Sequence, residues 1–250
     1  MMDKPKTYRE SYLLRTCDCD FTGFWRPSAI LTAMQEVAGA HSHFLGCGRD
    51  DLLKNNIVWV VTRAEVRMQR YPQVMEHITV ETFPGPLRRW FFPRYYVFRD
   101  EAGKQIGCAS TLWVLLNLKE RRMAAPGDVA KTIPDNSDLT PPLGLPAAVD
   151  LVDSEETVTN RMPAYFDLDV NQHVNNTRYL DWACDALGVE MMRAHCLKSF
   201  RVSYDSEVRP DQEISLRVSL RDGRCRVAGY HDGKLHFEVG AELGERTENE

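Results

Sequence analysis

The stretch Asp167-Leu-Asp-Val-Asn-Gln-His-Val-Asn-Asn176 decides how this chain is interpreted, because it gathers carboxylates, amides and a histidine into ten residues. It leads directly into residues 177–187, where apolar side chains recur at intervals of three and four, as on the buried face of a helix. Asn175 or Asn176 can cap the first turn of that helix. The unpaired N–H groups and the positive end of the helix dipole then face the polar stretch, a setting that stabilises an oxyanion.

The composition of the chain limits its size class, its binding partners and its compartment. The chain has 250 residues, 43% of them hydrophobic, enough for one large domain or two of ordinary size. A formal net charge of −5 argues against a general nucleic-acid binder. Seven cysteines without a CxxC pair indicate reduced thiols in a cytosol. Neither an apolar signal region nor an apolar run of membrane-spanning length occurs, so we expect a soluble intracellular protein.

The same order of elements is predicted twice: a strand, an irregular Asp-rich segment, a helix and then several antiparallel strands. The predicted elements are a strand at 8–15, a helix at 28–45, strands between 57 and 117, a strand at 157–162, a helix at 177–187 and strands between 199 and 241. Residues 132–150 are rich in Pro and short polar residues, which is typical of a linker. The sequence therefore predicts two α+β domains, residues 1–131 and 151–250.

The duplication can be tested by sliding the sequence 149 residues along itself without gaps. The aligned pairs are Asp18 with Asp167, Asp20 with Asp169, Thr22 with Asn171, and Phe24 with His173. Both aspartates are kept, whereas the Asn and the His are found in the second copy only. We therefore expect the second copy to carry the chemistry and the first to supply scaffold and apolar wall.

The segment 167–179 closely resembles a motif of acyl-ACP thioesterases of the plant and bacterial fatty-acid type. Shorter matches at 56–63, 70–72, 111–117 and 204–207 extend this resemblance over nearly the whole chain. The resemblance implies a tandem double hotdog, each repeat a long central helix wrapped by an antiparallel sheet. It also implies hydrolysis of the thioester between a fatty acyl chain and acyl carrier protein (ACP), a step of fatty acid biosynthesis. The family's catalytic positions carry over onto Asp169, Asn171, His173 and Glu207.

Thioester hydrolysis needs a positioned water or nucleophile, stabilisation of the charged carbonyl oxygen, and a proton for the leaving thiolate. We hypothesise that Glu207 and His173 orient and deprotonate the water, while Asn171 and backbone N–H groups near the helix start hold the oxyanion. Asp169 either holds this arrangement or attacks the thioester itself, and the sequence leaves both alternatives open. A cysteine found beside the glutamate in some family members is Val208 here, which argues against a thiol nucleophile at that position.

The remaining site predictions concern the first half. The helix at 28–45 offers an apolar face that serves as core or, in part, lines a tunnel for the acyl tail. The predicted tunnel residues are Phe24, Trp25, Met34, Val37 and Ala38. Basic residues of this half form either a solvated strand face or a docking patch for the acidic ACP. The predicted docking residues are Arg88, Arg89 and Arg94.

Two other functions compete with ACP thioester hydrolysis. A hotdog thioesterase acting on acyl-CoA would share the site, and a non-catalytic fatty-acyl-binding module would leave Asn171, His173 and Glu207 unexplained. We expect no metal and no cofactor, since no HxH or HExxH arrangement has supporting ligands. The expected compartment is the bacterial cytoplasm, or an organelle stroma if a transit peptide has been removed. Chain-length preference and a further homodimer stay open.

Overall fold

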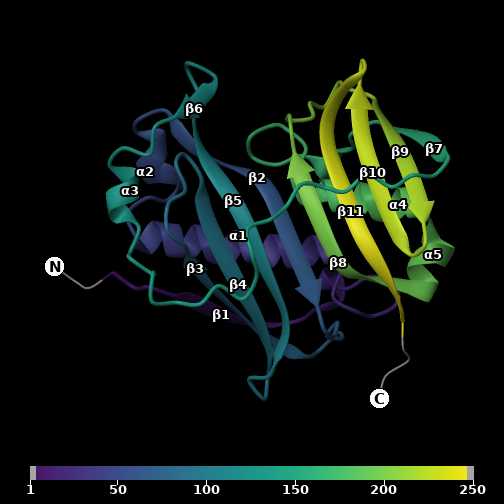
Figure 1. Ribbon diagram of the computed structural model, residues 1–250, viewed down its shortest axis with the longest axis horizontal. Coiled ribbons are helices and arrows are strands. Elements are labelled where there is room, and N and C mark those ends of the chain that lie inside the picture. Colours follow the sequence, from purple (N-terminus) through teal and green to yellow (C-terminus); the bar gives the residue numbers. More distant parts are fainter. Residues whose placement is uncertain (1–3, 247–250) are drawn as a thin grey trace. The chain divides into compact units, whose positions relative to one another are not determined.

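The computed structural model describes residues 4–246 and divides into two compact units, Met1–Pro146 and Ala147–Glu250. The division falls within the Pro-rich segment 132–150, and residues 133–155 contain no helix or strand. Figure 1 shows the elements of the first unit in purple to teal and those of the second in green to yellow. Each unit contains one long helix and an antiparallel sheet.

The first unit places helix α1 (Pro27–Phe44) on an antiparallel sheet with strand order β1-β3-β4-β5-β2. Its strands are β1 (Tyr8–Leu13), β2 (Ile57–Met68), β3 (His77–Pro84), β4 (Phe92–Asp100) and β5 (Gln105–Asn117), with β6 (Arg122–Ala124) paired to β5. The short helices are η1 (Thr16–Asp18), α2 (Arg49–Leu53) and α3 (Val129–Thr132). Pro27 stands in the first turn of α1, and Gly46 follows its end with φ +77°, a conformation that glycine adopts without strain.

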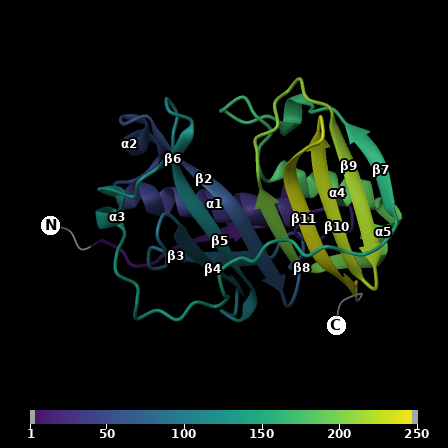
Figure 2. The same ribbon diagram turned by 45° about the horizontal axis from the view of Figure 1, so that its top comes forward.

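The second unit repeats this arrangement around α4 (Arg178–Leu187), with strand order β8-β11-β10-β9-β7 (Figure 2). Its strands are β7 (Glu156–Arg161), β8 (His195–Tyr204), β9 (Ile214–Arg221), β10 (Arg224–His231) and β11 (Lys234–Glu245). The short helices are η2 (Tyr165–Asp167) and α5 (Val189–Ala194). The turns β9–β10 and β10–β11 are the Asp-Gly pairs 222–223 and 232–233, all with positive φ, as tight two-residue hairpins require.

The buried stripe of α1 agrees with the predicted helical periodicity: Ile30, Leu31, Met34, Val37, Ala38 and His41 are all buried. In the second unit, the ring of Tyr179 on α4 stacks on Phe237 of β11, with centroids 4.2 Å apart and planes 4° from parallel. The predicted α+β class with a long helix on an antiparallel sheet in each half is therefore confirmed. Short elements such as α2, α5 and β6 were not predicted, because a few residues carry too little periodicity.

Among residues 4–246, no helix combines the length and the apolar character needed to cross a bilayer.

Candidate active site

The polar motif lies in the second unit as a closed turn between η2 and α4. The Asp169 N–H donates to the carbonyl oxygen of His173 (3.0 Å), and the Gln172 N–H donates to the carbonyl oxygen of Asp169 (3.0 Å). Gln172 has φ +65°, in the left-handed region that glycine tolerates far better. The turn therefore keeps a locally unfavourable residue conformation, a feature that clusters at functional sites.

Asp169 holds Asn171 through both carboxylate oxygens. Its Oδ1 accepts from the Asn171 N–H (2.8 Å), and its Oδ2 accepts from the Asn171 side-chain Nδ2 (3.3 Å). Hydrogen bonds to a charged acceptor are stronger than those between neutral groups. The contacts thus fix the direction in which the Asn171 amide points from the turn.

His173 and Glu207 come together from separate loops. The His173 Nε2 and Glu207 Oε1 atoms lie 3.4 Å apart, and both side chains are half-exposed, at 33% and 40%. Directly beside them the Val174 N–H donates to the carbonyl oxygen of Val208 (2.9 Å), which ties the two loops together. An imidazole paired with a carboxylate and open to solvent is an arrangement that can bind and deprotonate a water molecule.

Asn175 connects the turn to the start of α4. Its Oδ1 accepts from the N–H of Thr177 (3.0 Å) and from the Thr177 hydroxyl (2.8 Å), which fixes the residue before the helix. The N-cap residue is Thr177 and no side chain within the described residues 4–246 caps the first turn of α4, so the predicted capping by Asn175 or Asn176 is wrong. The Oδ1 of the neighbouring Asn176 is buried without a hydrogen-bond partner. The N-terminal end of α4 therefore lies a few residues from the polar turn, as the sequence indicated.

Asp167 has a structural role. Its buried carboxylate accepts from the indole Nε1 of Trp182 (3.2 Å) and from the N–H of Ala164 (2.8 Å). A guanidinium nitrogen of Arg161 lies 3.7 Å from its Oδ1. These contacts fasten the start of the loop to α4, in agreement with the cap-and-turn role that its position before a helix predicts.

The predicted tunnel residues lie in the first unit. Trp25, Met34, Val37 and Ala38 are buried, and Phe24 is half-buried. The Trp25 ring meets the edge of Phe98 on β4, with centroids 5.6 Å apart. Met34, Val37 and Ala38 lie on the buried face of α1 and Trp25 just before it, and the role of all five residues as tunnel lining stays a prediction.

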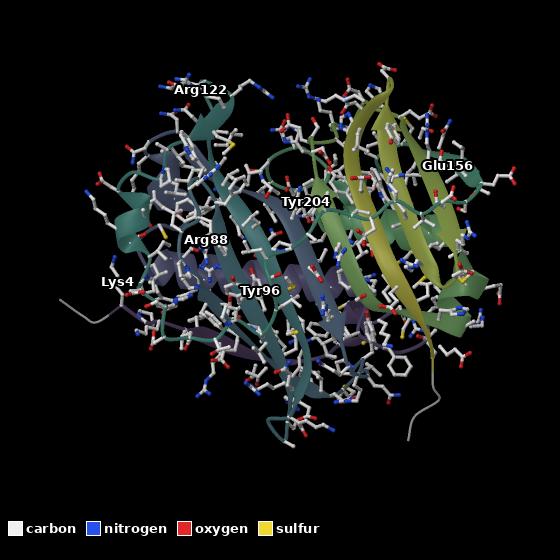
Figure 3. All side chains as sticks on the ribbon, in the orientation of Figure 1. Lys4, Arg88, Tyr96, Arg122, Glu156 and Tyr204 are labelled. Carbon is white, nitrogen blue, oxygen red and sulfur yellow. The ribbon has the colours of Figure 1, made fainter. Side chains whose placement is uncertain are left out.

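The docking prediction needs one correction, which concerns Arg94. Arg88, labelled in Figure 3, and Arg89 are exposed in the loop between β3 and β4. Arg94 is only 6% exposed, and its guanidinium donates to Nδ1 of His41 (3.1 Å) and to the hydroxyls of Thr82 and Ser42 (3.4 Å each). The inclusion of Arg94 in an exposed docking patch is therefore wrong. The run of apolar and aromatic residues around Arg94 contained the signal, since β4 is buried on both faces from Phe92 to Phe98.

His41, on the buried face of α1, is held neutral by this environment. Its Nδ1 accepts from Arg94, and its Nε2 faces the carbonyl oxygen of Pro5 (3.0 Å), so the ring proton resides on Nε2. Burial, reinforced by the Arg94 charge, lowers the pKa of His41 to about 4. Among residues 4–246, no group of three or more His, Cys, Asp and Glu side chains is arranged to hold a metal ion, and a metal-free site stays a prediction.

Family models match both halves of the chain. The acyl-ACP thioesterase N-terminal domain matches residues 5–133, and the acyl-ACP thioesterase C-terminal domain matches residues 152–245. The chain therefore belongs to the acyl-ACP thioesterase family. It is 28% identical over 244 residues to the chloroplastic dodecanoyl-[acyl-carrier-protein] hydrolase of Umbellularia californica, covering 88% of this chain and 61% of that protein. It is also 28% identical over 254 residues to the chloroplastic palmitoyl-acyl carrier protein thioesterase of Arabidopsis thaliana, covering 94% of this chain and 62% of that protein.

The chain thus spans about three fifths of the length of these curated relatives. Solved structures show the same fold. An acyl-ACP thioesterase from Bacteroides thetaiotaomicron superposes with a TM-score of 0.86 at 23% identity, covering 96% of this chain and 98% of that one. The 12:0-ACP thioesterase from Umbellularia californica superposes with a TM-score of 0.80 at 22% identity, covering 97% and 98%. Both repeats are therefore hotdog domains.

Proposed function

We propose that this protein hydrolyses the thioester of fatty acyl-ACP and releases free fatty acid, which ends chain elongation. The observation that carries the proposal is the pairing of His173 with Glu207, 3.4 Å apart, beside the Asp169–Asn171 turn at the start of α4. Family membership and the names of the curated relatives, which are hydrolases and thioesterases of acyl carrier protein substrates, support it.

In the proposed reaction, Glu207 and His173 position a water molecule and accept its proton as its oxygen attacks the thioester carbonyl carbon. Asn171 and backbone N–H groups at the start of α4 stabilise the oxyanion that forms. When the carbon–sulfur bond breaks, the proton held by the His173–Glu207 pair passes to the leaving thiolate. Each group thus acts where charge develops, which is where an enzyme lowers the barrier.

For Asp169 we propose the holding role. Both of its oxygens already accept hydrogen bonds from Asn171, which supports a carboxylate that orients the amide. A nucleophilic Asp169 would instead form an acyl-carboxylate anhydride, and water attack at the Asp169 carbonyl carbon of this anhydride would leave a water oxygen in the carboxylate. Single turnover in water labelled with ¹⁸O tests this route, because the holding role leaves Asp169 unlabelled and a labelled Asp169 would contradict it.

The proposed partner is ACP, and the exposed Arg88 and Arg89 are the proposed docking residues. Complementary charge acts mainly on the association rate and is screened by salt. We therefore expect kcat/KM to fall with ionic strength, and the Arg88→Glu, Arg89→Glu double variant to lower kcat/KM at low salt with kcat retained. An unchanged kcat/KM for the double variant would remove these residues from the docking surface.

The acyl tail is proposed to pack against Met34, Val37, Ala38, Phe24 and Trp25, with tunnel depth selecting chain length. The plant relatives are named as chloroplastic. For this chain we propose the bacterial cytoplasm or an organelle stroma as the compartment.

The decisive experiment is hydrolysis of a panel of saturated acyl-ACPs, from short to long chains, with matched acyl-CoAs beside it. We expect chain-selective release of fatty acid from acyl-ACP, and a loss of about 100- to 1000-fold in Asp169→Asn and His173→Ala. Faster turnover of the matched acyl-CoAs would assign the CoA carrier instead. Tight acyl binding without release would replace the enzyme by a fatty-acyl-binding module.

A further inference from the structure

The backbone of Glu207 is held from behind by a buried histidine. His236 of β11 is 3% exposed, and its Nδ1 lies 2.9 Å from the carbonyl oxygen of Glu207. A carbonyl oxygen only accepts, so Nδ1 must carry the proton and donate. His236 therefore presents a fixed N–H to the residue that pairs with His173.

The backbone of His236 also binds the two residues that precede Glu207. Its carbonyl oxygen accepts from the N–H groups of Asp205 and Ser206, at 2.9 Å each. The regular pairing of β8 with β11 ends one residue earlier, at Tyr204 opposite Phe237; Tyr204 is labelled in Figure 3. The backbone hydrogen bonds between β11 and the chain after β8 thus continue past Tyr204 to Ser206. They fix the direction in which the chain enters Glu207.

A second buried ring holds the residue that follows Glu207. The Tyr179 hydroxyl oxygen accepts from the N–H of Val208 (3.2 Å), and Tyr179 is itself buried against Phe237. The carbonyl oxygen of Val208 in turn accepts from Val174, the residue after His173. The Glu207 backbone is therefore fixed on both sides by side chains that do not reach the solvent face of the site.

We propose that His236 is a positioning residue for thioester hydrolysis, whose Nδ1–H sets the backbone of Glu207 so that its carboxylate meets His173, with Tyr179 fixing the next peptide. The inference rests on the proposed function. Misplacing a reacting group by about 1 Å is enough to cost about 100-fold in rate. Supporting residues that lock the rotamers of site residues are what keep such displacements small.

The placement of a histidine here calls for a reason beyond packing. Burial lowers the pKa of His236, so the ring stays neutral and brings a polar group into the apolar core. Burying a polar group is unfavourable unless it is hydrogen-bonded, and an apolar residue of similar volume would leave the Glu207 carbonyl oxygen without this donor. The hydrogen bond to the Glu207 carbonyl oxygen satisfies the buried Nδ1–H of His236, and it acts on the residue that pairs with His173.

The test compares three substitutions in the full chain. His236→Leu keeps the volume and is more apolar, His236→Asn places an amide N–H where Nδ1 stands, and His236→Gln places one farther out. Positioning predicts that His236→Leu lowers kcat for acyl-ACP hydrolysis by about 10- to 100-fold with KM unchanged. His236→Asn should recover most of that loss, and His236→Gln should recover less. Packing alone predicts the reverse, with Leu the best tolerated.

A double-mutant cycle with Glu207→Gln gives the second readout. If His236 acts through Glu207, His236→Leu should change kcat less than about 2-fold when Glu207 is already Gln. Independent, multiplicative losses in the cycle would overturn the proposal, as would a folded His236→Leu variant with normal kcat. If His236→Leu fails to fold, as judged by circular dichroism, equal kcat in the Asn and Gln variants overturns it. A wild-type chain that releases no fatty acid refutes the proposed function instead.

Discussion

The loops at residues 15–26 and 164–175 have the same backbone hydrogen bonds but different chemistry. In both, the first aspartate closes a short 3-10 turn, and the second bonds across to the residue four positions later: Asp20 to Phe24 (2.9 Å) and Asp169 to His173 (3.0 Å). The second aspartate also accepts from the N–H two residues on, at 2.8 Å in each loop. The turn is therefore a property of the repeat, and the chemistry is added by side chains.

Only the two aspartates are identical between the aligned loops, and two of the differing positions bear directly on the chemistry and the turn. Phe24 stands where the second loop has His173, and Gly23, at φ +84°, stands where it has Gln172, at φ +65°. The first loop thus adopts the left-handed conformation with the residue that tolerates it, whereas the second retains a side chain there. Asp20 forms the same turn as Asp169. The hydrogen bonds of Asp169 are therefore not by themselves evidence that it acts as a nucleophile.

The largest expected effect comes from giving the second loop the residue of the first. His173→Phe should keep the turn, since Phe24 occupies the equivalent place, while removing the imidazole next to Glu207. We expect kcat for acyl-ACP to fall about 1000-fold with little change in melting temperature. Steady-state kinetics and thermal unfolding measure both. A His173→Phe variant with near-normal turnover would show that the His173–Glu207 pair does not take part in the reaction.

The next effect concerns His41, which is buried whereas His173 is half-exposed. Because the folded-state pKa of His41 is lowered to about 4, the unfolded chain binds more protons than the folded one between about pH 6.5 and 4. The contribution of His41 to stability is therefore lost as pH falls through this window, by up to about 3 kcal/mol. Urea unfolding at pH 7 and pH 5 measures the loss.

The control for this pH effect is His43, which lies on the same helix but is exposed. His43→Gln retains the buried His41 ring and should therefore retain the loss of stability between pH 7 and 5. If the free energy of unfolding between pH 7 and 5 is flat in the wild type, the neutral buried His41 is contradicted.

A smaller effect is expected from substituting Asp169, compared with the equivalent Asp20 of the first loop. Asp169→Ala should lower kcat about 100-fold, because Asn171 loses the carboxylate that orients it. Asp20→Ala removes the equivalent carboxylate acceptor from the first loop and should lower only stability, by about 1 to 2 kcal/mol. Kinetics and denaturant unfolding of both variants form a matched pair. Equal losses of kcat would mean that the first loop takes part in the reaction.

The smallest effect concerns the left-handed residue. Gln172→Gly should relieve about 1 kcal/mol of backbone strain and raise the melting temperature by about 2 to 4 °C. The reciprocal Gly23→Gln should lower it by a similar amount, since it introduces a side chain at φ +84°. A lower melting temperature for Gln172→Gly would indicate that the Gln172 side chain makes a stabilising contact that outweighs the strain.

Much of this protein was determined by its local sequence. The alternation of apolar residues in strands, the three- and four-residue spacing of α1 and α4, and the Asp-Gly hairpins each act over a few residues, so the order of elements and their duplication could be predicted. The polar motif could be found for the same reason, because Asp169, Asn171 and His173 lie within five residues of one another.

Only the tertiary structure decided which distant groups meet. His173 reaches Glu207 because the Val174–Val208 hydrogen bond joins their loops, and His236 stands behind Glu207 because the β8–β11 register places it there. Arg94 turned out to be buried because its strand face packs against α1, although its charge suggested a surface residue. Sheet register and helix packing arise from contacts between residues far apart in the chain, which no local pattern encodes.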